Sequence, residues 1–147
     1  GSAMSTKKTG ADLEELSHLI IGFYEKISSW EHAVVRGTGL SPAQMHAIEI
    51  IGQEKSLRMK ELAEQLGVTT GSLTVMVDRL EQNGFLERKP HESDRRSFLV
   101  TLTDKGKKHF KKHHQYHLKL TDDVLAALEP AERQNFAAAL ALIIKRL

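Results

Sequence analysis

The segment from about Arg58 to Leu102 limits the possible folds of this 147-residue chain more than any other part of the sequence. The spacing of apolar residues predicts a short helix over 60–66. Gly67-Val68 then indicates a tight turn, and the hydroxyl residues after it can cap a second helix over about 70–82. Asn83-Gly84 ends that second helix, because both residues tolerate a left-handed backbone.

A charged hairpin is expected directly after these two helices. The strand candidates are 85–89 and 97–102, and the polar segment 90–96 forms the tip between them. In such an arrangement the second helix fits the major groove of DNA, and the hairpin reaches the adjoining backbone or minor groove. We therefore expect a winged helix-turn-helix DNA-binding lobe over 42–102, with the two-stranded β-hairpin as its wing.

Further helices are expected on both sides of this lobe. Ser41-Pro42 starts a short helix that reaches about Ile51 and is closed by Gly52. A long helix begins after Thr103, and Glu129-Pro130 starts the last one. The first helix of the chain carries an apolar stripe with steps of three and four residues, at Leu13, Leu16, Ile20, Phe23, Ile27, Trp30 and Val34. The predicted fold class is mainly α, with about six helices and one β-hairpin.

The apolar stripes of the first and last helices exceed the area that a small winged lobe can cover. On a monomer they would leave a large exposed apolar patch, so we expect them to pack between two copies of the chain. Residues 11–36 and 103–147 are therefore predicted to be the dimerisation helices of a single domain, 1–147. A homodimer with two-fold symmetry matches a DNA site with two-fold symmetry.

Composition limits the location and the chemistry of the chain. It has no cysteine, which excludes disulfides and thiol catalysis, and no apolar run approaches the roughly 18 residues that a membrane span needs. We expect a soluble, cytoplasmic protein without a membrane partner, in which Gly1-Ser2-Ala3 is a cloning remnant before a native start at Met4. An enzyme is the main alternative class. It is disfavoured because the sequence has no HExxH motif, nucleophile elbow or Gly-rich phosphate loop.

Basic residues gather in and after the predicted wing, although the net charge is only +2. Between Arg88 and Lys112, nine Lys and Arg stand against three Asp and Glu. The candidate DNA contacts are hydroxyls at the start of the second helix, arginines of the wing and two weaker basic candidates: Thr69, Thr70, Ser72, Thr74, Arg95, Arg96, Arg79 and Lys60. Each has a plain alternative role, as a helix cap, a partner of Asp94 or a solvated surface charge.

Four of the eight histidines lie on one predicted helix. Three of them, His109, His113 and His117, follow one another at intervals of four residues and so share one face, whereas His114 does not. A pair of histidines four residues apart on a helix can chelate a divalent metal such as zinc. Three interpretations remain open, namely a zinc site, a structural or effector-proximal polar cluster, and a solvated basic face.

Several longer motifs resemble those of the MarR family of bacterial regulators. They are Leu62-Ala63-Glu64-Gln65-Leu66-Gly67-Val68-Thr69, the run from Leu73 to Arg88, Asp94-Arg95-Arg96-Ser97 and Leu102-Thr103-Asp104-Lys105-Gly106. The resemblance covers nearly the whole chain. It implies a triangular homodimer, expected to be a repressor, in which each winged lobe binds one half of a pseudo-palindromic operator. Many members carry Arg in the middle of the recognition helix where this chain has Val75, so their base preference does not transfer.

Two subgroups of that family are similar to this chain around the histidines. His113 and His117 resemble the helical ligands of zinc-sensing repressors, and that resemblance implies His46 and Glu31 as further Zn²⁺ ligands. The fatty-acid-synthesis repressors, which respond to acylated carrier protein, share the stretch 45–52 and the same histidine spacing.

The candidate effectors are therefore a metal ion, a small molecule and acylated carrier protein. A ligand bound where the winged lobes meet the dimerisation helices would favour one lobe separation, with a coupling to DNA binding of about 1–3 kcal/mol. An architectural DNA-binding protein without a small effector is the remaining alternative.

Overall fold

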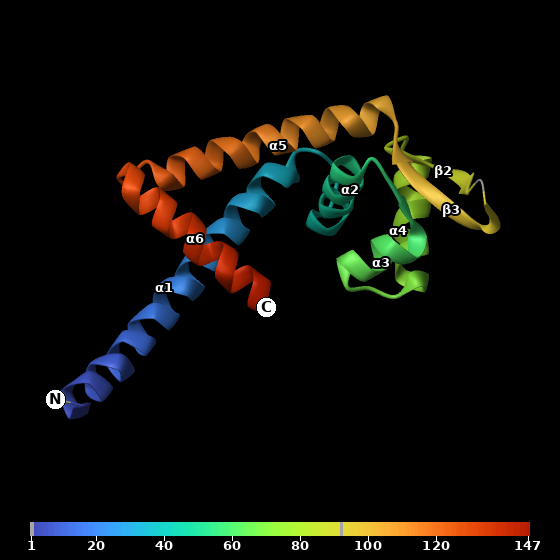
Figure 1. Cartoon of the computed structure of the whole chain (residues 1–147). Coiled ribbons are helices and arrows are strands. Elements are labelled where there is room, and N and C mark those ends of the chain that lie inside the picture. Colours follow the sequence, from blue (N-terminus) through green and yellow to red (C-terminus); the bar gives the residue numbers. More distant parts are fainter. Residues whose placement is uncertain (1, 92) are drawn as a thin grey trace. The chain divides into compact units, whose positions relative to one another are not determined.

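The computed structural model describes the backbone of residues 2–91 and 93–147, and the side chains of residues 12–90, 93 and 97–147. Within that backbone it contains six helices and a three-stranded antiparallel sheet (Figure 1). The mainly α, winged-helix fold class is confirmed, although the sheet has one strand more than the predicted hairpin. The chain divides into two compact units, residues 1–47 and 48–147.

The first unit contains α1 (Ser2–Arg36) and the beginning of α2 (Pro42–Glu54). The apolar stripe predicted over 13–34 lies within α1, and Leu13 and Ile20 on it are more than half exposed. The predicted capping box starts α2. The Ser41 N–H donates to Oε1 of Gln44 at 2.9 Å, and the Gln44 N–H donates to Oγ of Ser41 at 3.1 Å.

Helix α2 does not end at Gly52, as the sequence analysis predicted, but continues to Glu54. A Cβ on Gly52 would overlap the ring of Phe110, which belongs to α5 (Asp104–Leu125). The glycine therefore permits close packing between two helices instead of ending one. The helix ends before Lys55, whose φ of 70° is the left-handed conformation that glycine usually takes at such a position.

The second unit holds the winged lobe. Helices α3 (Met59–Leu66) and α4 (Thr70–Gln82) are joined through Gly67, which has a φ of 68°, so the predicted helix-turn-helix is confirmed. Strands β2 (Leu86–His91) and β3 (Asp94–Leu102) form the wing and extend further towards its tip than predicted.

A short strand that the sequence analysis missed, β1 (Ser56–Arg58), pairs antiparallel with β3 on the side away from β2. Its central residue, Leu57, lies opposite Val100, and both side chains are buried. Three residues are too few to display the alternation of apolar and polar side chains by which a strand is recognised.

Apolar side chains from the helices and from the foot of the wing form the core of the lobe. The buried residues from 57 to 102 are Leu57, Leu62, Ala63, Leu73, Val77, Leu80, Phe85, Leu86, Val100 and Leu102. Three of them, Leu73, Val77 and Leu80, form one stripe on α4. That stripe fixes which face of α4 is left for solvent or for a partner.

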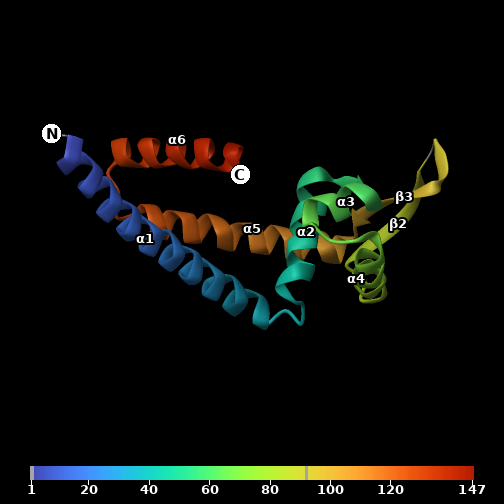
Figure 2. The ribbon, with the colours of Figure 1, turned by 90° about the horizontal axis from the view of Figure 1, so that it is seen from below.

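The two last helices begin at the predicted caps. Thr103 precedes α5 and accepts a hydrogen bond from the Gly106 N–H at 3.1 Å, and Glu129 precedes α6 (Pro130–Arg146) and donates its N–H to Glu132 at 2.9 Å. Figure 2 shows α5 leaving the foot of the wing and α6 reversing the direction of the chain. In the part of the chain that the structure describes, we found no helix with the length and apolarity that crossing a membrane requires.

Candidate DNA-binding surface and histidine cluster

Helix α4 presents a polar face on the side opposite its buried stripe. Thr70, Ser72, Thr74 and Arg79 are exposed on it, as is Val75, which is 56% exposed in the middle of the helix. An exposed branched apolar side chain at this place contributes little to the core, whereas its burial would stabilise the fold. The exposed face of α4 therefore combines hydroxyl groups, one apolar side chain and one cation.

Two of the predicted hydroxyl contacts also serve the helix itself. Thr69 is the N-cap of α4, and its Oγ1 accepts the Ser72 N–H at 3.1 Å. The hydroxyl of Thr74 donates to the carbonyl of Thr70 at 2.8 Å. Capping and local bonding hold these hydroxyls in place on the surface, and they leave acceptor capacity on each oxygen.

The base of the wing is tied to α4 by Arg88. Its guanidinium on β2 lies 2.7 Å from a carboxylate oxygen of Asp78 and 2.8 Å from one of Glu81, both on α4. The side-chain hydrogen bonds from Arg88, then its backbone hydrogen bond and its charge, hold the pKa of the Glu81 carboxyl below its ordinary value. The same side-chain bond to Glu81 raises the pKa of Arg88. The wing thus has a fixed attachment to the helix beside it.

The Leu-Thr-x-x-Gly sequence at 102–106 joins α4, the wing and α5. The hydroxyl of Thr103 donates to the carbonyl of Gly84, and the Thr103 N–H donates to the carbonyl of Phe85 at 3.1 Å. Lys105 donates to the carbonyl of Asn83 at 2.7 Å and places its ammonium group 4.4 Å from the centre of the Phe85 ring. A Cβ on Gly106 would overlap the Phe85 carbonyl, so this position requires glycine. The lobe is therefore anchored to the first turn of α5.

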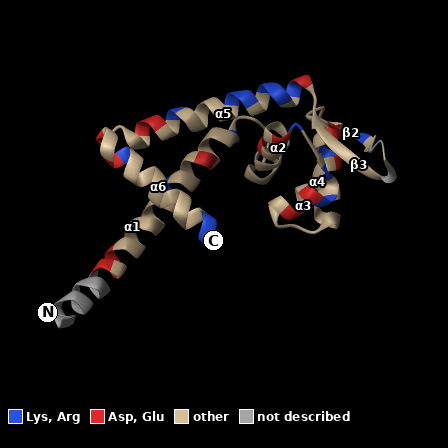
Figure 3. Ribbon diagram, in the orientation of Figure 1, with Lys and Arg blue, Asp and Glu red and all other residues tan. Residues whose placement is uncertain are grey.

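The remaining basic candidates are less constrained. Arg79 and Lys60 are exposed, on α4 and α3 respectively. Arg95 and Arg96 lie on β3 by their backbone, but their side chains fall outside the part that the structure describes, so their DNA contacts stay predictions. Figure 3 shows Lys and Arg gathered along the first half of α5, where the sequence has Lys105, Lys107, Lys108, Lys111 and Lys112.

Two of the histidines on α5 converge on one carboxylate. Nε2 of His113 lies 3.0 Å from Oε1 of Glu49 on α2, and Nδ1 of His117 lies 3.4 Å from Oε2 of the same residue. The two imidazole rings are 4.4 Å apart, and His113 is only 2% exposed. One donor atom from each of the three residues lies within 4.8 Å of the others. Two imidazoles and a carboxylate are a donor set that suits Zn²⁺.

The other two histidines of α5 have different surroundings. His109 meets the Phe85 ring edge-on at 4.9 Å and bonds to the Lys105 carbonyl at 3.0 Å, whereas His114 is exposed and stacks on Phe110. Glu31 lies half-buried on α1, and His46 is exposed on α2. Both belong to residues 1–47, so their service as metal ligands stays a prediction.

Sequence reasoning missed two residues that organise these sites. Arg88 stands in the sequence within a basic run and at the end of a longer motif, and nothing there marks its two acidic partners across a helix end and a turn. Glu49 was not singled out as a partner of the histidines. A signal for it was available, because Glu49 interrupts the apolar residues Met45, Ile48 and Ile51, all of which are buried.

Residues 40–98 match the sequence profile of the MarR family. The chain is 34% identical over 109 residues to YfiV, an HTH-type transcriptional regulator of Bacillus subtilis, and the match covers 74% of this chain and 68% of that protein. Its fold resembles Streptococcus pneumoniae FabT in complex with DNA, with a TM-score of 0.84 at 23% identity over 90% of this chain and 94% of that one. A mutant MarR from E. coli, complexed with operator DNA, gives a TM-score of 0.70 at 27% identity, over 87% and 92% of the two chains.

Proposed function

The chain belongs to the MarR family of transcriptional regulators, and on that premise we propose that it is a repressor that binds a pseudo-palindromic operator as a homodimer. Its activity is DNA-binding regulation of transcription, not enzymatic catalysis. The cytoplasm, where its DNA lies, is the proposed location. The observation that carries the operator proposal is the exposed polar face of α4, beside a wing whose base is bonded to that helix.

Helix α4 supplies the proposed contacts to the major groove. Its N-terminus and the hydroxyls of Thr69, Thr70, Ser72 and Thr74 suit phosphate oxygens and base edges, and Arg79 suits a phosphate. Val75 suits the methyl group of a thymine, because it is apolar and exposed on the same helix. On the wing, Arg95 and Arg96 are proposed to contact the minor groove, and Lys60 on α3 a backbone phosphate.

The homodimer is supported by apolar surface on both predicted dimerisation regions. On α1, Ile20 and Tyr24 are 62% and 66% exposed, and on α6, Leu142 and Ile144 are 72% and 68% exposed. An isolated chain would leave these large side chains in water, at a cost of about 25 cal/mol per Å² of apolar surface. We propose that a second copy of the chain covers these apolar side chains.

Selection from random-sequence duplexes, followed by footprinting, tests the operator proposal. We expect a short inverted repeat, and an affinity that falls steeply with salt because a dimer neutralises many phosphates. Arg79→Gln should weaken DNA binding and reduce the slope of log affinity against log salt concentration by about one for each lost phosphate contact. Lys119→Gln on α5 is the matched control and should leave both the affinity and the slope as in the parent. Uniform affinity for random duplexes would favour the architectural alternative and contradict the proposal.

A ligand that binds one separation of the two lobes better than another would regulate the operator complex. A small molecule and acylated carrier protein are the proposed organic effectors. Each can be added to the labelled operator complex, and a shift in the midpoint of the DNA titration identifies the effector. A free-energy coupling of 1–3 kcal/mol corresponds to a shift of about 5-fold to 150-fold.

Zinc is a second candidate effector, supported by the convergence of His113 and His117 on Glu49. Glu31 and His46 are the proposed additional ligands. Calorimetric titration of the metal-stripped protein with Zn²⁺ tests this, and His113→Ala/His117→Ala should abolish binding whereas His114→Ala should retain it. Equal binding by the double variant would contradict a metal site, as would an operator affinity that responds neither to Zn²⁺ nor to a chelator. Single Glu31→Ala and His46→Ala variants test the further ligands.

A further inference from the structure

The side of α4 that lies opposite its buried stripe is the side that can meet the floor of a DNA groove. At about 100° per residue, Gly71, Val75 and Asp78 lie on that side of the helix. A recognition helix contacts base edges mainly with its N-terminal residues. These three positions are therefore the ones from which α4 can read a base.

The N-terminal part of α4 lacks the side chains that read purines. Residues 70–78 are Thr, Gly, Ser, Leu, Thr, Val, Met, Val and Asp. Guanine is read by bidentate hydrogen bonds from Arg or Lys, and adenine by those from Asn or Gln. On α4 these residue types occur only at Arg79 and Gln82, in the C-terminal part of the helix. The part of α4 that enters the groove first thus has no side chain for bidentate purine readout.

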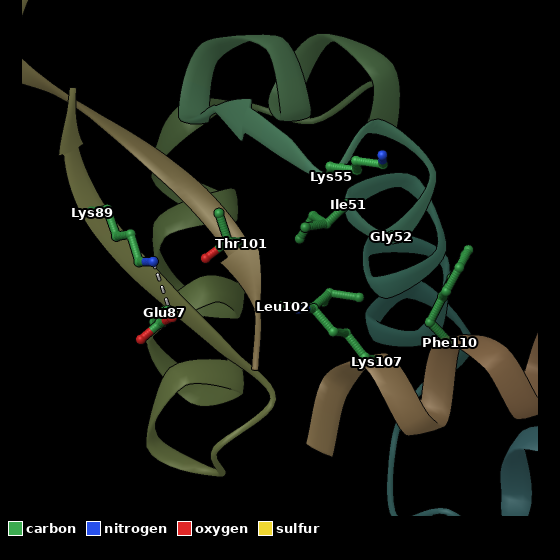
Figure 4. Close-up of a pocket in the computed structure, with 9 residues that line it drawn as sticks. All are labelled: Ile51, Gly52, Lys55, Glu87, Lys89, Thr101, Leu102, Lys107 and Phe110. Atoms are coloured by element: carbon green, nitrogen blue, oxygen red, sulfur yellow. Dashed lines mark ion pairs between the residues drawn. The ribbon is translucent and has the colours of Figure 1, made fainter. Parts of the chain in front are cut away.

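The acids on and beside α4 could recognise the amino group of cytosine, but each already has a basic partner. Asp78 and Glu81 both bind the guanidinium of Arg88, at 2.7 Å and 2.8 Å. On β2, Oε1 of Glu87 lies 3.6 Å from Nζ of Lys89, and both residues line the cavity of about 470 Å³ that Figure 4 shows. A cytosine would have to displace one of these cations in order to be read by a carboxylate.

The hydroxyl groups of α4 do not distinguish one base from another. A hydroxyl both donates and accepts, so it can bond to any base edge or to a phosphate. Ser72 accepts a hydrogen bond from the Thr69 hydroxyl at 3.2 Å, and Thr74 donates to the carbonyl of Thr70 at 2.8 Å. These hydroxyls can add affinity for DNA, but they do not supply a preference for one sequence.

Val75 is the side chain that remains at the reading positions. It is 56% exposed in the second turn of α4. The C5-methyl group of thymine is the one apolar group that the standard base pairs present in the major groove. Gly71, one turn before Val75, has no side chain that would keep the helix away from the bases. A thymine methyl group in contact with Val75 would remove apolar surface of both partners from water.

We propose that α4 recognises each half of the operator through a thymine methyl group packed against Val75, without a bidentate hydrogen bond to a purine. This inference rests on the proposed function, because it names the DNA sequence that the same surface selects. It also has a consequence for modified DNA. 5-Methylcytosine carries a methyl group at the same place in the groove, so it should be accepted in place of this thymine, whereas cytosine and uracil should not.

Replacement of thymine by deoxyuridine tests the proposal, because it removes only the methyl group. In the inverted repeat obtained by selection, each symmetric pair of thymines is replaced in turn, and each duplex is titrated with the parent protein. We expect one pair whose replacement weakens binding about 15-fold, which is about 4-fold for each of the two methyl groups. Replacement of the other pairs should change the affinity by much less.

Val75→Ala connects that methyl group to the protein. Alanine preserves the helix, since its helix propensity exceeds that of valine, but its side chain is too short to reach the methyl group. The variant should bind the thymine operator more weakly than the parent does, and it should lose the sensitivity to deoxyuridine at that pair. Ser72→Ala is the matched control. It removes a hydroxyl from the exposed face of the same helix, so it should keep the parent's ratio between the thymine and uracil operators.

5-Methylcytosine provides a test that does not depend on uracil. A C·G pair at the identified position should weaken binding, and methylation of that cytosine should restore about 4-fold in each half of the operator. Equal affinity for the cytosine and 5-methylcytosine duplexes would contradict readout of the methyl group.

Failure of this inference can be told apart from failure of the proposed function. If the parent selects an inverted repeat but binds all its deoxyuridine forms equally well, the methyl readout is overturned and the operator proposal stands. A sensitivity to deoxyuridine that persists in Val75→Ala also overturns it, because the methyl group would then act through the shape of the DNA. A parent protein that selects no sequence overturns both proposals.

Discussion

Arg88 on β2 donates three hydrogen bonds to the carboxylate of Glu81 on α4, from its backbone N–H at 3.0 Å, from Nε at 3.3 Å and from one terminal nitrogen at 2.8 Å. The pair fixes the foot of the wing to the C-terminal end of α4. A backbone donor and a guanidinium that meet one carboxylate define an orientation as well as a distance. The direction in which the wing leaves the lobe therefore depends on this contact.

We predict that Glu81→Gln lowers the free energy of unfolding by about 0.5–1 kcal/mol. The amide keeps the shape of the side chain but lacks the charge that strengthens its bonds with Arg88, and partial exposure limits the loss. Urea unfolding at neutral pH measures the change. Glu64→Gln, an exposed acid on α3, is the control and should change stability by much less. An equal effect of both substitutions would refute a specific role for Glu81.

The stabilisation by Glu81 should also depend on pH. Hydrogen bonds from Arg88 lower the pKa of Glu81 in the folded protein, so its contribution is complete above the unfolded pKa of about 4.3 and is lost as pH falls through the folded value. The difference in unfolding free energy between the parent and Glu81→Gln should therefore shrink below pH 4. A difference that stays constant from pH 7 to pH 3, measured by urea unfolding, would contradict this.

Gly106→Ala should destabilise the protein by about 1–3 kcal/mol. The new methyl group would overlap the Phe85 carbonyl, and the backbone must shift to accommodate it. Thermal unfolding measures the loss. Gly71→Ala on α4 is the matched control, because its Cβ would have only ordinary contact at 3.9 Å. That control should leave the stability equal or slightly higher, because Gly71 lies in the first turn of α4, where alanine gains less than in a helix interior. Two losses of similar size would show that the crowding at Gly106 is not specific.

Ile144→Glu should convert the proposed homodimer to a monomer. Ile144 is 68% exposed on α6, and a carboxylate there could not be buried between two chains without a partner. Sedimentation at several protein concentrations measures the oligomeric state. Gln134→Glu, an exposed polar position on the same helix, adds the same charge as a control. A parent protein that sediments as a monomer, or an Ile144→Glu variant that stays dimeric, would contradict the proposed interface.

The fold was largely predictable because local chemistry marks most of its helix ends. Thr69 and Thr103 cap the helices after them as expected, and Gly67 takes the left-handed conformation that a tight turn requires. The prediction that Gly52 ends a helix was wrong, because the role of this glycine depends on its contact with Phe110, 58 positions later in the sequence. The sequence alone does not distinguish a glycine that permits close packing of two helices from a glycine that ends a helix.

The sequence predicted only those parts of the candidate sites whose residues lie on a single helix or strand. The exposed hydroxyls of α4 and the spacing of His113 and His117 follow from helical periodicity. Glu49, which both histidines approach, comes from another helix, and its part in the cluster required the tertiary structure. The same holds for Arg88, because side chains that meet across elements leave no periodic signal in the sequence.

The anchoring of α5 through Thr103, Lys105 and Gly106 has a mechanical consequence. A helix of 22 residues is about 33 Å long, and one fixed rigidly to the lobe at its first turn works as a lever arm. A tilt of about 5° at the far end of such an arm corresponds to a displacement of about 3 Å over its length. A small tilt of α5 around residues 118–125 would therefore produce a larger displacement of the winged lobe at the other end of the helix.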